Sequence, residues 1–366
     1  MYFQNLVGND HIKSYLTHMV QKGAIGNSLL FAGPDGIGKS QFALELAKML
    51  ICKEDVNGTH AHKIDSGTHP DIHAFRPAGK LGLHSIEAMR NFSDDVYLAP
   101  YEAKWKVFLI HDADKMLAYS ANALLKTFEE PSPDSLIILL SSSPESLLPT
   151  VRSRCRTIYF HPVEEAEIAK VLVAKHQKSE DEAKALAAQA DGSIGRALHL
   201  AERGEDPRRL ILMNTLAARK MNSYNELQKM AAEIGNETDQ VKKQVEESAR
   251  QELLKGFTET LSATQQQALE KEIEGAVSRR YNEEVDALLG MILGWYRDLH
   301  LLHVNGNPNY LMHRDHHENL EDCLQNGGLL PLDEVQKFIN QAKLALERSS
   351  SLNVCLESLF LKLNYL

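Results

Sequence analysis

Short apolar runs alternate with amphipathic segments over the first part of the chain. The apolar runs lie at residues 28–32, 106–110, 136–140 and 157–160. Between them, helical periodicity is clearest over 40–50, and helices are also predicted over roughly 84–94 and 120–129. Short apolar runs separated by helices are typical of a parallel sheet covered on both faces. The pattern therefore predicts an α/β domain with a parallel sheet over residues 1–161.

The pattern becomes wholly helical after Pro162, because a proline disfavours helix at the residue before it and so marks a boundary. Helices are predicted over Glu164–His176 and Ser179–Gln189, within a small helical domain at residues 162–206. No strand pattern follows. An all-helical domain is predicted over residues 207–366, with one irregular stretch at 300–330 and a break near Asn353.

Length and charge limit the possible functions. A chain of 366 residues, at about 150 residues per domain, is expected to hold two to three domains. The 40 basic and 50 acidic residues give a net charge of −10, which argues against a protein that coats nucleic acid through bulk positive charge. Arg152, Arg154 and Arg156 alternate and would share one side of an extended segment, but charge alone indicates no DNA-binding element.

The sequence indicates neither export nor a membrane span. It contains no stretch of about 18 consecutive apolar residues, and its N-terminus lacks a basic segment followed by an apolar one. The four cysteines form no CxxC pair, so a disulfide framework is not expected. These features predict a cytoplasmic protein with no membrane contact.

The strongest chemical motif is a glycine-rich loop at residues 33–40, GPDGIGKS, which matches GxxxxGK[ST] at every fixed position. It follows a predicted strand and opens a predicted helix, as a phosphate-binding loop must. The glycines let backbone N–H groups surround a phosphate at the helix N-terminus. Lys39 can reach the β- and γ-phosphates, and Ser40 can ligate magnesium. The fixed positions are Gly33, Gly38, Lys39 and Ser40, with Gly36 inside the loop.

The second predicted strand ends differently from that of an active ATPase. The position directly after residues 106–110 is His111, where a carboxylate usually holds magnesium. Neutral imidazole is a poor partner for Mg²⁺, which prefers oxygen ligands. Asp112 and Asp114 follow, and Asp112 is the alternative magnesium ligand. The residues therefore favour a loop that binds nucleotide in a site with impaired hydrolysis.

Several motifs occur in the order found in the clamp-loader ATPases of bacterial DNA polymerase III, which belong to the AAA+ class and include gamma/tau and delta-prime subunits. The chain resembles this family strongly over residues 1–200 and more weakly beyond. The motifs that carry the resemblance, besides the phosphate loop, are FQNLVG at 3–8, THPD at 68–71, NALLKTFEEP at 122–131, SSSP at 141–144, SRC at 153–155 and WYRDL at 295–299.

The resemblance implies roles for individual residues. Val7 and Gly8 match the segment that packs on the adenine. Ser141 or Ser142 matches the sensor near the γ-phosphate, and Arg154 would be offered in trans to a neighbouring subunit's ATP as an arginine finger. The family's second sensor is an arginine in a GSxR pattern, but residues 192–196 read GSIGR, one position late. One position rotates a helical residue by about 100°, which weakens the case for an active ATPase.

The same resemblance implies the architecture and the partners. We expect an AAA+ domain, a helical lid and a helical collar that joins gamma/tau and delta-type subunits in a heteropentamer. That assembly loads the sliding clamp on primed DNA. His111 favours a delta-prime-like subunit that can bind ATP with Mg²⁺ but hydrolyses it weakly or not at all. The alternatives are an active gamma/tau-type motor subunit or another AAA+ DNA-processing ATPase.

Many members of this family hold zinc with four cysteines after the first helix. Here the corresponding region has a single cysteine, Cys52, together with His60, His62, His69 and His73. A structural zinc site requires four ligands at regular spacing, and this set fits no usual spacing. Zinc is therefore not expected.

A second group of histidines lies in the predicted irregular stretch. It comprises His300, His303, His313, His316 and His317, with Cys323 nearby. We interpret these side chains as solvated rather than metal-bound.

Overall fold

The computed structural model describes residues 2–55, 58–77, 82–176, 178–203, 206–254, 263–325 and 329–365. The chain divides into two compact units, Met1–Ala78 with Gly82–Glu202, and Gly79–Leu81 with Arg203–Leu366. Each unit has its own core. The domain boundaries proposed after residues 161 and 206 remain predictions.

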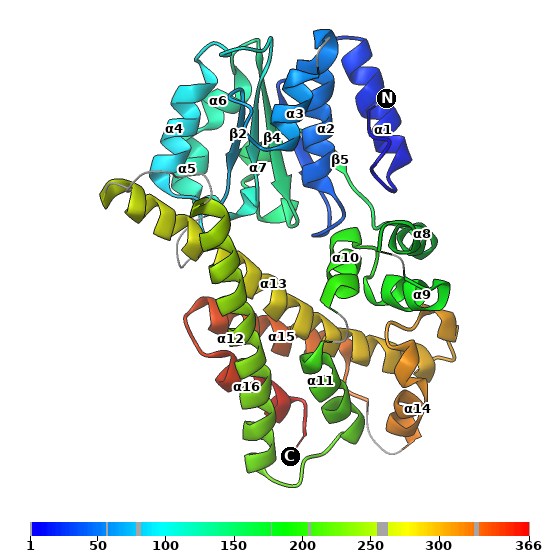
Figure 1. Ribbon diagram of the computed structural model, residues 1–366. Helices are drawn as coiled ribbons and strands as arrows, with labels where there is room; N and C mark the ends of the chain where they lie inside the picture. Colours follow the sequence, from blue (N-terminus) through cyan, green and yellow to red (C-terminus); the bar gives the residue numbers. More distant parts are fainter. Residues whose placement is uncertain are drawn as a thin grey trace. The chain divides into compact units, whose positions relative to one another are not determined.

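The first unit is built on a five-stranded parallel sheet with the order β2-β3-β4-β1-β5 (Figure 1). The predicted strands are confirmed as β1, β3, β4 and β5. The sequence pattern missed β2, which is short, carries a histidine and is only partly buried at the sheet edge. The strands are β1 (Ser28–Ala32), β2 (Ile72–Phe75), β3 (Lys106–Ile110), β4 (Ser135–Ser141) and β5 (Arg156–Tyr159).

Helices cover both faces of this sheet, which is why its central strands are apolar throughout. Leu29 and Phe31 pack with α1, α2 and α3, whereas Leu30 and Ala32 pack with α4 to α7 on the opposite face. Successive side chains of a strand point to opposite faces, so each face needs its own apolar set. The helices are α1 (Asp10–Gln21), α2 (Lys39–Ile51), α3 (Thr59–Asp65), α4 (Ile86–Val96), α5 (Ala118–Ala123), α6 (Leu125–Glu129) and α7 (Pro149–Arg152).

Three helices follow the last strand in the same unit and pack around a small core of their own. They are α8 (Glu165–His176), α9 (Glu180–Gln189) and α10 (Ile194–Arg203). Their shared core is mostly alanine with Val163, Ile168 and Leu172, and Val7 of the N-terminal segment packs against it. Alanine lets these short helices approach closely.

The second unit is helical throughout its described residues, as the sequence pattern predicts. Its helices are α11 (Pro207–Ala218), α12 (Tyr224–Leu254), α13 (Ala263–His303), α14 (His317–Gln325), α15 (Leu332–Glu347) and α16 (Leu352–Lys362). The predicted break near Asn353 instead falls between Glu347 and Leu352, so Asn353 lies inside α16.

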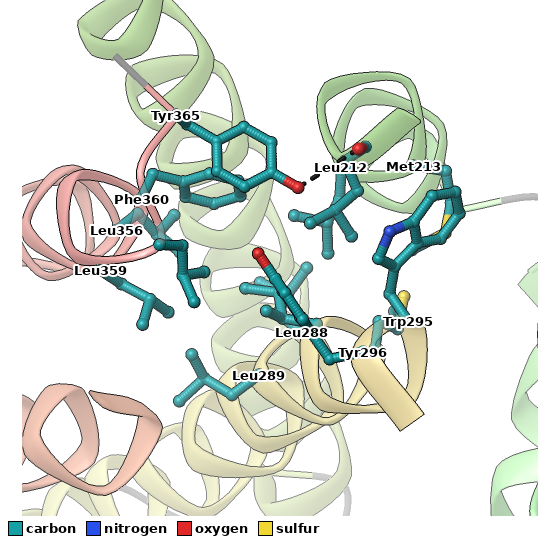
Figure 2. Packing of buried hydrophobic residues seen from close by; sticks show 14 of the residues in the cluster. Leu212, Met213, Leu288, Leu289, Trp295, Tyr296, Leu356, Leu359, Phe360 and Tyr365 are labelled. Carbon is teal, nitrogen blue, oxygen red and sulfur yellow. Dashed lines mark hydrogen bonds between the residues drawn. The ribbon is translucent and has the colours of Figure 1, made fainter. Parts of the chain in front are cut away.

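One large core holds this second unit together (Figure 2). Trp295 of α13 is fully buried and is the largest side chain in the cluster. The C-terminal segment closes the core, because the Tyr365 hydroxyl donates to the Leu216 carbonyl at 3.2 Å and the Met221 amide donates to the Tyr365 carbonyl at 2.8 Å.

The interpretation of the second histidine group as solvated is wrong for His313, which is 4% exposed. Its Nε2 donates to the Met291 carbonyl at 3.2 Å, and its amide donates to buried Asp298 at 2.8 Å. The segment can approach α13 because Gly294 has no side chain; a β-carbon there would lie 2.9 Å from the Met312 sulfur. The polar composition of the segment after α13 does not reveal that the segment folds back onto this helix.

Two further expectations concern the surface. Among the described residues, no helix is long and apolar enough to cross a membrane. The arginines at 152, 154 and 156 do not share one extended segment, since Arg152 ends helix α7 and Arg156 begins β5 over the Tyr15 ring, 5.2 Å from its centroid. The condition under which the three arginines would share one side, an extended segment, is therefore not met.

Acid is expected to destabilise the second unit through His313. Burial lowers the pKa of His313 to about 4 from 6.5, so the unfolded chain takes up a proton at a higher pH than the folded one. Stability is then complete above pH 6.5 and is lost as pH falls towards 4. The free energy of unfolding should drop by about 2 kcal/mol between pH 7 and pH 5.

Urea unfolding followed by Trp295 fluorescence in a Trp105→Phe background measures this drop. His313→Gln keeps a donor for Met291 but cannot titrate, and it should remove most of the difference. His303→Gln, at the exposed last residue of α13, is the control. An equal pH dependence in the wild type and His313→Gln would contradict the assignment.

Candidate functional site: the phosphate loop and its surroundings

The loop between β1 and α2 has the backbone that phosphate binding requires. Gly36 and Gly38 have φ angles of 73° and 96°, a region that side chains disfavour. Gly38 caps α2, whose first turn contains no acidic residue. A free helix N-terminus of this kind favours bound anions.

Lys39 lies folded into its own loop. Its ammonium group donates to the carbonyls of Gly33 at 2.5 Å and Pro34 at 2.8 Å, and it lies 3.5 Å from a carboxylate oxygen of Asp35. The side chain is buried, and burial lowers its pKa. A phosphate entering the loop would replace these carbonyls as the partner of the ammonium group.

The tip of the loop is fastened to α10. The Gly195 amide donates to the Gly36 carbonyl at 2.8 Å. Ser193 Oγ accepts the Arg196 amide at 3.2 Å, and it lies where a β-carbon on Gly36 would come within 2.2 Å of it. The GSIGR segment thus touches the phosphate loop through its backbone.

His111 lies beside the serine that would ligate magnesium. Its Nδ1 is 3.5 Å from Ser40 Oγ, and the residue is 9% exposed. A second histidine holds the backbone of His111, because buried His84 donates through Nε2 to the His111 carbonyl at 2.7 Å. Burial lowers the pKa of His84 and keeps that ring neutral at pH 7.

The structure distinguishes the two candidate sensor serines. Ser141 is fully buried, and its hydroxyl donates to Asp114 at 2.6 Å while accepting the Ser143 amide at 3.1 Å. Ser142 is half-buried. Asp114 is therefore occupied by Ser141, and Asp112 has a left-handed backbone with φ of 47° directly after His111.

Arg154 of the SRC motif is held at the surface by Glu129 of the NALLKTFEEP motif. Its guanidinium lies 3.3 Å from both carboxylate oxygens of Glu129 and donates to the Thr150 carbonyl at 3.0 Å. The side chain remains 29% exposed. Neighbouring Cys155 is buried, and burial raises the pKa of its thiol to about 12, so it serves packing. The EEP and SRC motifs thus meet in space, which their sequence separation conceals.

Val7 and Gly8 lie where the N-terminal segment meets the helical region. A β-carbon on Gly8 would come within 2.9 Å of Val163. Asn9 fastens this segment, because its side-chain amide donates to the His161 carbonyl and accepts the His161 amide, each at 2.9 Å. This clamp was not predicted, although an asparagine beside a glycine is a turn signal.

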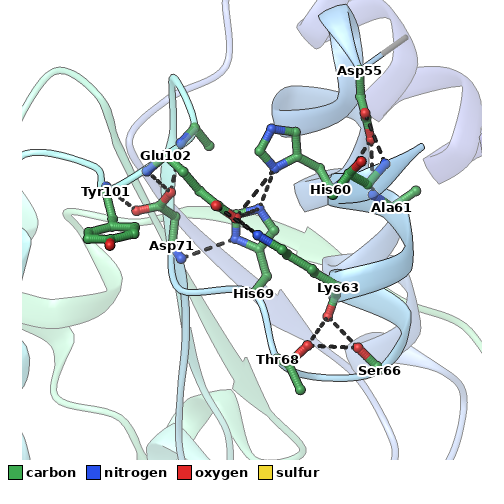
Figure 3. A network of polar contacts seen from close by, with 12 residues as sticks. Asp55, His60, Ala61, Lys63, Ser66, Thr68, His69, Asp71, Tyr101 and Glu102 are labelled. Carbon is green, nitrogen blue, oxygen red and sulfur yellow. Dashed lines mark hydrogen bonds and ion pairs between the residues drawn. The ribbon is translucent and has the colours of Figure 1, made fainter. Parts of the chain in front are cut away.

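The region of Cys52 and the histidines that follow it contains a cluster of polar side chains (Figure 3). In the described part of the chain, the grouping that could hold a metal is His60, His69 and Glu102, with one ligand atom of each within 4.8 Å of the others. Cys52 is outside it, and His73 stacks on Phe108 instead. Sequence spacing could not suggest Glu102.

The protonation of this cluster opposes metal binding. The Asp71 amide donates to His69 Nδ1 at 3.1 Å, so the proton of the neutral ring lies on Nε2. Nε2 then donates to His60 Nδ1 at 2.8 Å and has no lone pair for a metal. Burial lowers the pKa of His69, and Lys63 already neutralises Glu102 at 2.8 Å.

Asp71 of the THPD motif holds a neighbouring loop in place (Figure 3). Its carboxylate accepts the backbone amides of Tyr101, Glu102 and Ala103 at 2.5, 2.9 and 2.8 Å. These bonds to the charged form help keep its pKa below the usual value despite burial. The loop that they order presents Tyr101 almost fully to solvent.

The parallel sheet with the order β2-β3-β4-β1-β5 and the phosphate loop between β1 and α2 define the first unit as a P-loop domain of the AAA+ class. Residues 8–164 match the family model described as "DNA polymerase III, delta subunit". The first part of the chain is therefore similar to the clamp-loader subunits of DNA polymerase III.

Curated relatives agree with this family. DNA polymerase III subunit delta' of Bacillus subtilis is 33% identical over 44% of this chain and 50% of its own length. DNA polymerase III subunit tau of Escherichia coli is 30% identical over 55% of this chain and 32% of its own length. The chain thus spans half or less of these relatives.

Solved structures give weaker likenesses. A DNA polymerase III gamma subunit-related protein of Thermotoga maritima is 16% identical, with a TM-score of 0.40, over 91% of this chain and 98% of that one. The Thermotoga maritima RuvB branch migration motor is 18% identical, with a TM-score of 0.38, over 57% and 63%.

Gly36→Ala should destabilise the first unit more than an ordinary left-handed glycine replacement. Left-handed backbone costs an L-residue about 1–2 kcal/mol, and the new methyl group must also displace Ser193 Oγ, which caps α10. Gly23→Ala is the matched control, because Gly23 has φ of 61° with nothing within 4 Å.

Chemical unfolding followed by circular dichroism should show a loss for Gly36→Ala that exceeds the control by about 1 kcal/mol or more. Adding Ser193→Gly should recover part of that excess. Equal losses of unfolding free energy for the two alanine variants would mean that a side chain at position 36 does not clash with Ser193.

Proposed function

We propose that the chain is a delta-prime-type subunit of the DNA polymerase III clamp loader, which helps load the sliding clamp on primed DNA in the cytoplasm. The observation that carries this proposal is the combination of a complete phosphate loop with His111 beside Ser40, 3.5 Å away, in a clamp-loader domain. A motor subunit needs a carboxylate there to hold magnesium. Imidazole at that position favours a subunit that binds nucleotide and hydrolyses it weakly or not at all.

ATP would occupy the loop between β1 and α2. Backbone amides and Lys39 would hold its phosphates, and Val7 and Gly8 would contact the adenine. Ser142 would face the γ-phosphate, since Ser141 is buried against Asp114. Asp112 would polarise the attacking water. The residue before it is His111, so the carboxylate that usually holds magnesium at that position is missing.

Arg154 would serve a neighbouring subunit as an arginine finger. Its partial exposure and its fork of contacts to Glu129 support this role. Guanidinium is suited to the γ-phosphate because it presents several donors in one plane. In the assembly, phosphate oxygens of the neighbour's ATP would replace the Glu129 carboxylate.

The helical second unit would act as the collar that joins gamma/tau-type and delta-type subunits in a heteropentamer. Its broad core around Trp295 supports a rigid oligomerisation domain. In the first unit, Tyr97, Leu98 and Tyr101 are exposed beside the loop that Asp71 orders. Exposed aromatic residues on a rigid loop suit contact with another protein.

Lys39→Ala should abolish saturable ATP binding by the isolated chain, because the loop then lacks its cation. Isothermal calorimetry measures this directly. Lys48→Ala is the matched control, since Lys48 lies on the same helix but pairs with Glu45 and Asp65. Absence of ATP binding by the wild type at millimolar concentration would contradict the nucleotide assignment.

Arg154→Ala should remove ATP turnover at the neighbouring motor site of the reconstituted loader, by about 10³-fold at that site. Steady-state hydrolysis with clamp and primed DNA is the measurement, and gel filtration checks that the assembly is intact. Arg152→Ala, two residues away on exposed α7, is the control. Unchanged turnover would make Arg154 a surface residue only.

A further inference from the structure

The cation normally bound beside a phosphate loop does not fit this site. Mg²⁺ prefers near-octahedral oxygen ligands at about 2.0–2.1 Å. Ser40 offers one such oxygen, but the atom facing it at 3.5 Å is the imidazole Nδ1 of His111. An ion bound to Ser40 on that side would lie within ligand distance of Nδ1, so the ring would have to be a ligand.

The nearby carboxylates do not correct this mismatch. Asp114 accepts the Ser141 hydroxyl at 2.6 Å and is committed to β4. Asp112 lies one position late in a left-handed turn, outside the position that directly follows β3. His111 itself is buried and is held through its backbone by His84 at 2.7 Å and by Phe75, whose carbonyl accepts the His111 amide at 2.9 Å.

We infer that this loop binds ATP without Mg²⁺, and that His111 is the residue that excludes the ion. The inference rests on the proposed nucleotide binding and specifies the form of the ligand. The loop can balance phosphate charge from its own groups. Lys39 supplies a full positive charge, and the thirteen-residue helix α2 points its N-terminus at the site with no acid in its first turn.

Calorimetric titration of ATP into the full chain, once in EDTA and once in excess Mg²⁺, tests the inference. In excess Mg²⁺ most ATP is present as its Mg²⁺ complex, so the wild type should bind ATP about tenfold or more weakly there than in EDTA, because only the free nucleotide is competent. Equal dissociation constants in the two buffers would contradict the exclusion of the ion. His111→Asp restores an oxygen ligand beside Ser40 and should bind ATP about tenfold tighter with Mg²⁺ than with EDTA. His111→Phe, which keeps a ring but adds no oxygen ligand, is the matched control and should, like the wild type, gain no affinity from Mg²⁺.

Three further results would overturn the inference. Wild-type binding that weakens by about tenfold or more in EDTA would show that Asp112 or His111 holds Mg²⁺ after all. Tightening by Mn²⁺ but not by Mg²⁺ would show an imidazole-ligated metal site. No ATP binding in either buffer would refute the proposed nucleotide function itself. The wild-type comparison alone decides the question if His111→Asp fails to fold.

Discussion

The phosphate loop can take its place only because two of its backbone positions carry no side chain. A β-carbon on Gly33 would lie 2.6 Å from the Phe160 carbonyl, and one on Gly36 would lie 2.2 Å from Ser193 Oγ. The loop is therefore pressed between the end of β5 and the start of α10. The hydrogen bond from the Gly195 amide to the Gly36 carbonyl also connects the loop to α10. A change in the conformation of the loop would displace the helices that follow the sheet, because close-packed interiors transmit strain.

The charged groups of the first unit are satisfied by local partners. Lys39 lies on loop carbonyls, Asp114 accepts from Ser141, and Arg154 is paired with Glu129. In the proposed function, phosphate oxygens would replace the loop carbonyls at Lys39 and the Glu129 carboxylate at Arg154. Because each exchange replaces one hydrogen bond by another, its net free energy is modest. What distinguishes this site from a motor site is the ring of His111, which brings nitrogen where a hard cation needs oxygen.

The second unit combines an apolar core with a few fully buried polar groups. Arg208 forms an ion pair with Glu284 and also pairs with Asp206, which caps α11. Buried Asp298 accepts two backbone amides of the segment that carries His313. Removing one partner of such a pair is costly, because the other is left buried without compensation. These contacts fix how the irregular segments return to α13.

The sequence alone determined the elements that depend on local pattern. Apolar runs located four of the five strands, and GPDGIGKS located the phosphate loop, because its glycines and lysine are needed at fixed spacing. It missed β2, whose half-polar edge position lacks an apolar run. Only the tertiary structure decided which distant groups meet. It joined Glu129 to Arg154, brought His60, His69 and Glu102 together, and buried His313 behind Gly294. It also separated Ser141 from Ser142. Such pairings depend on how segments far apart in the chain pack, and no local spacing encodes that packing.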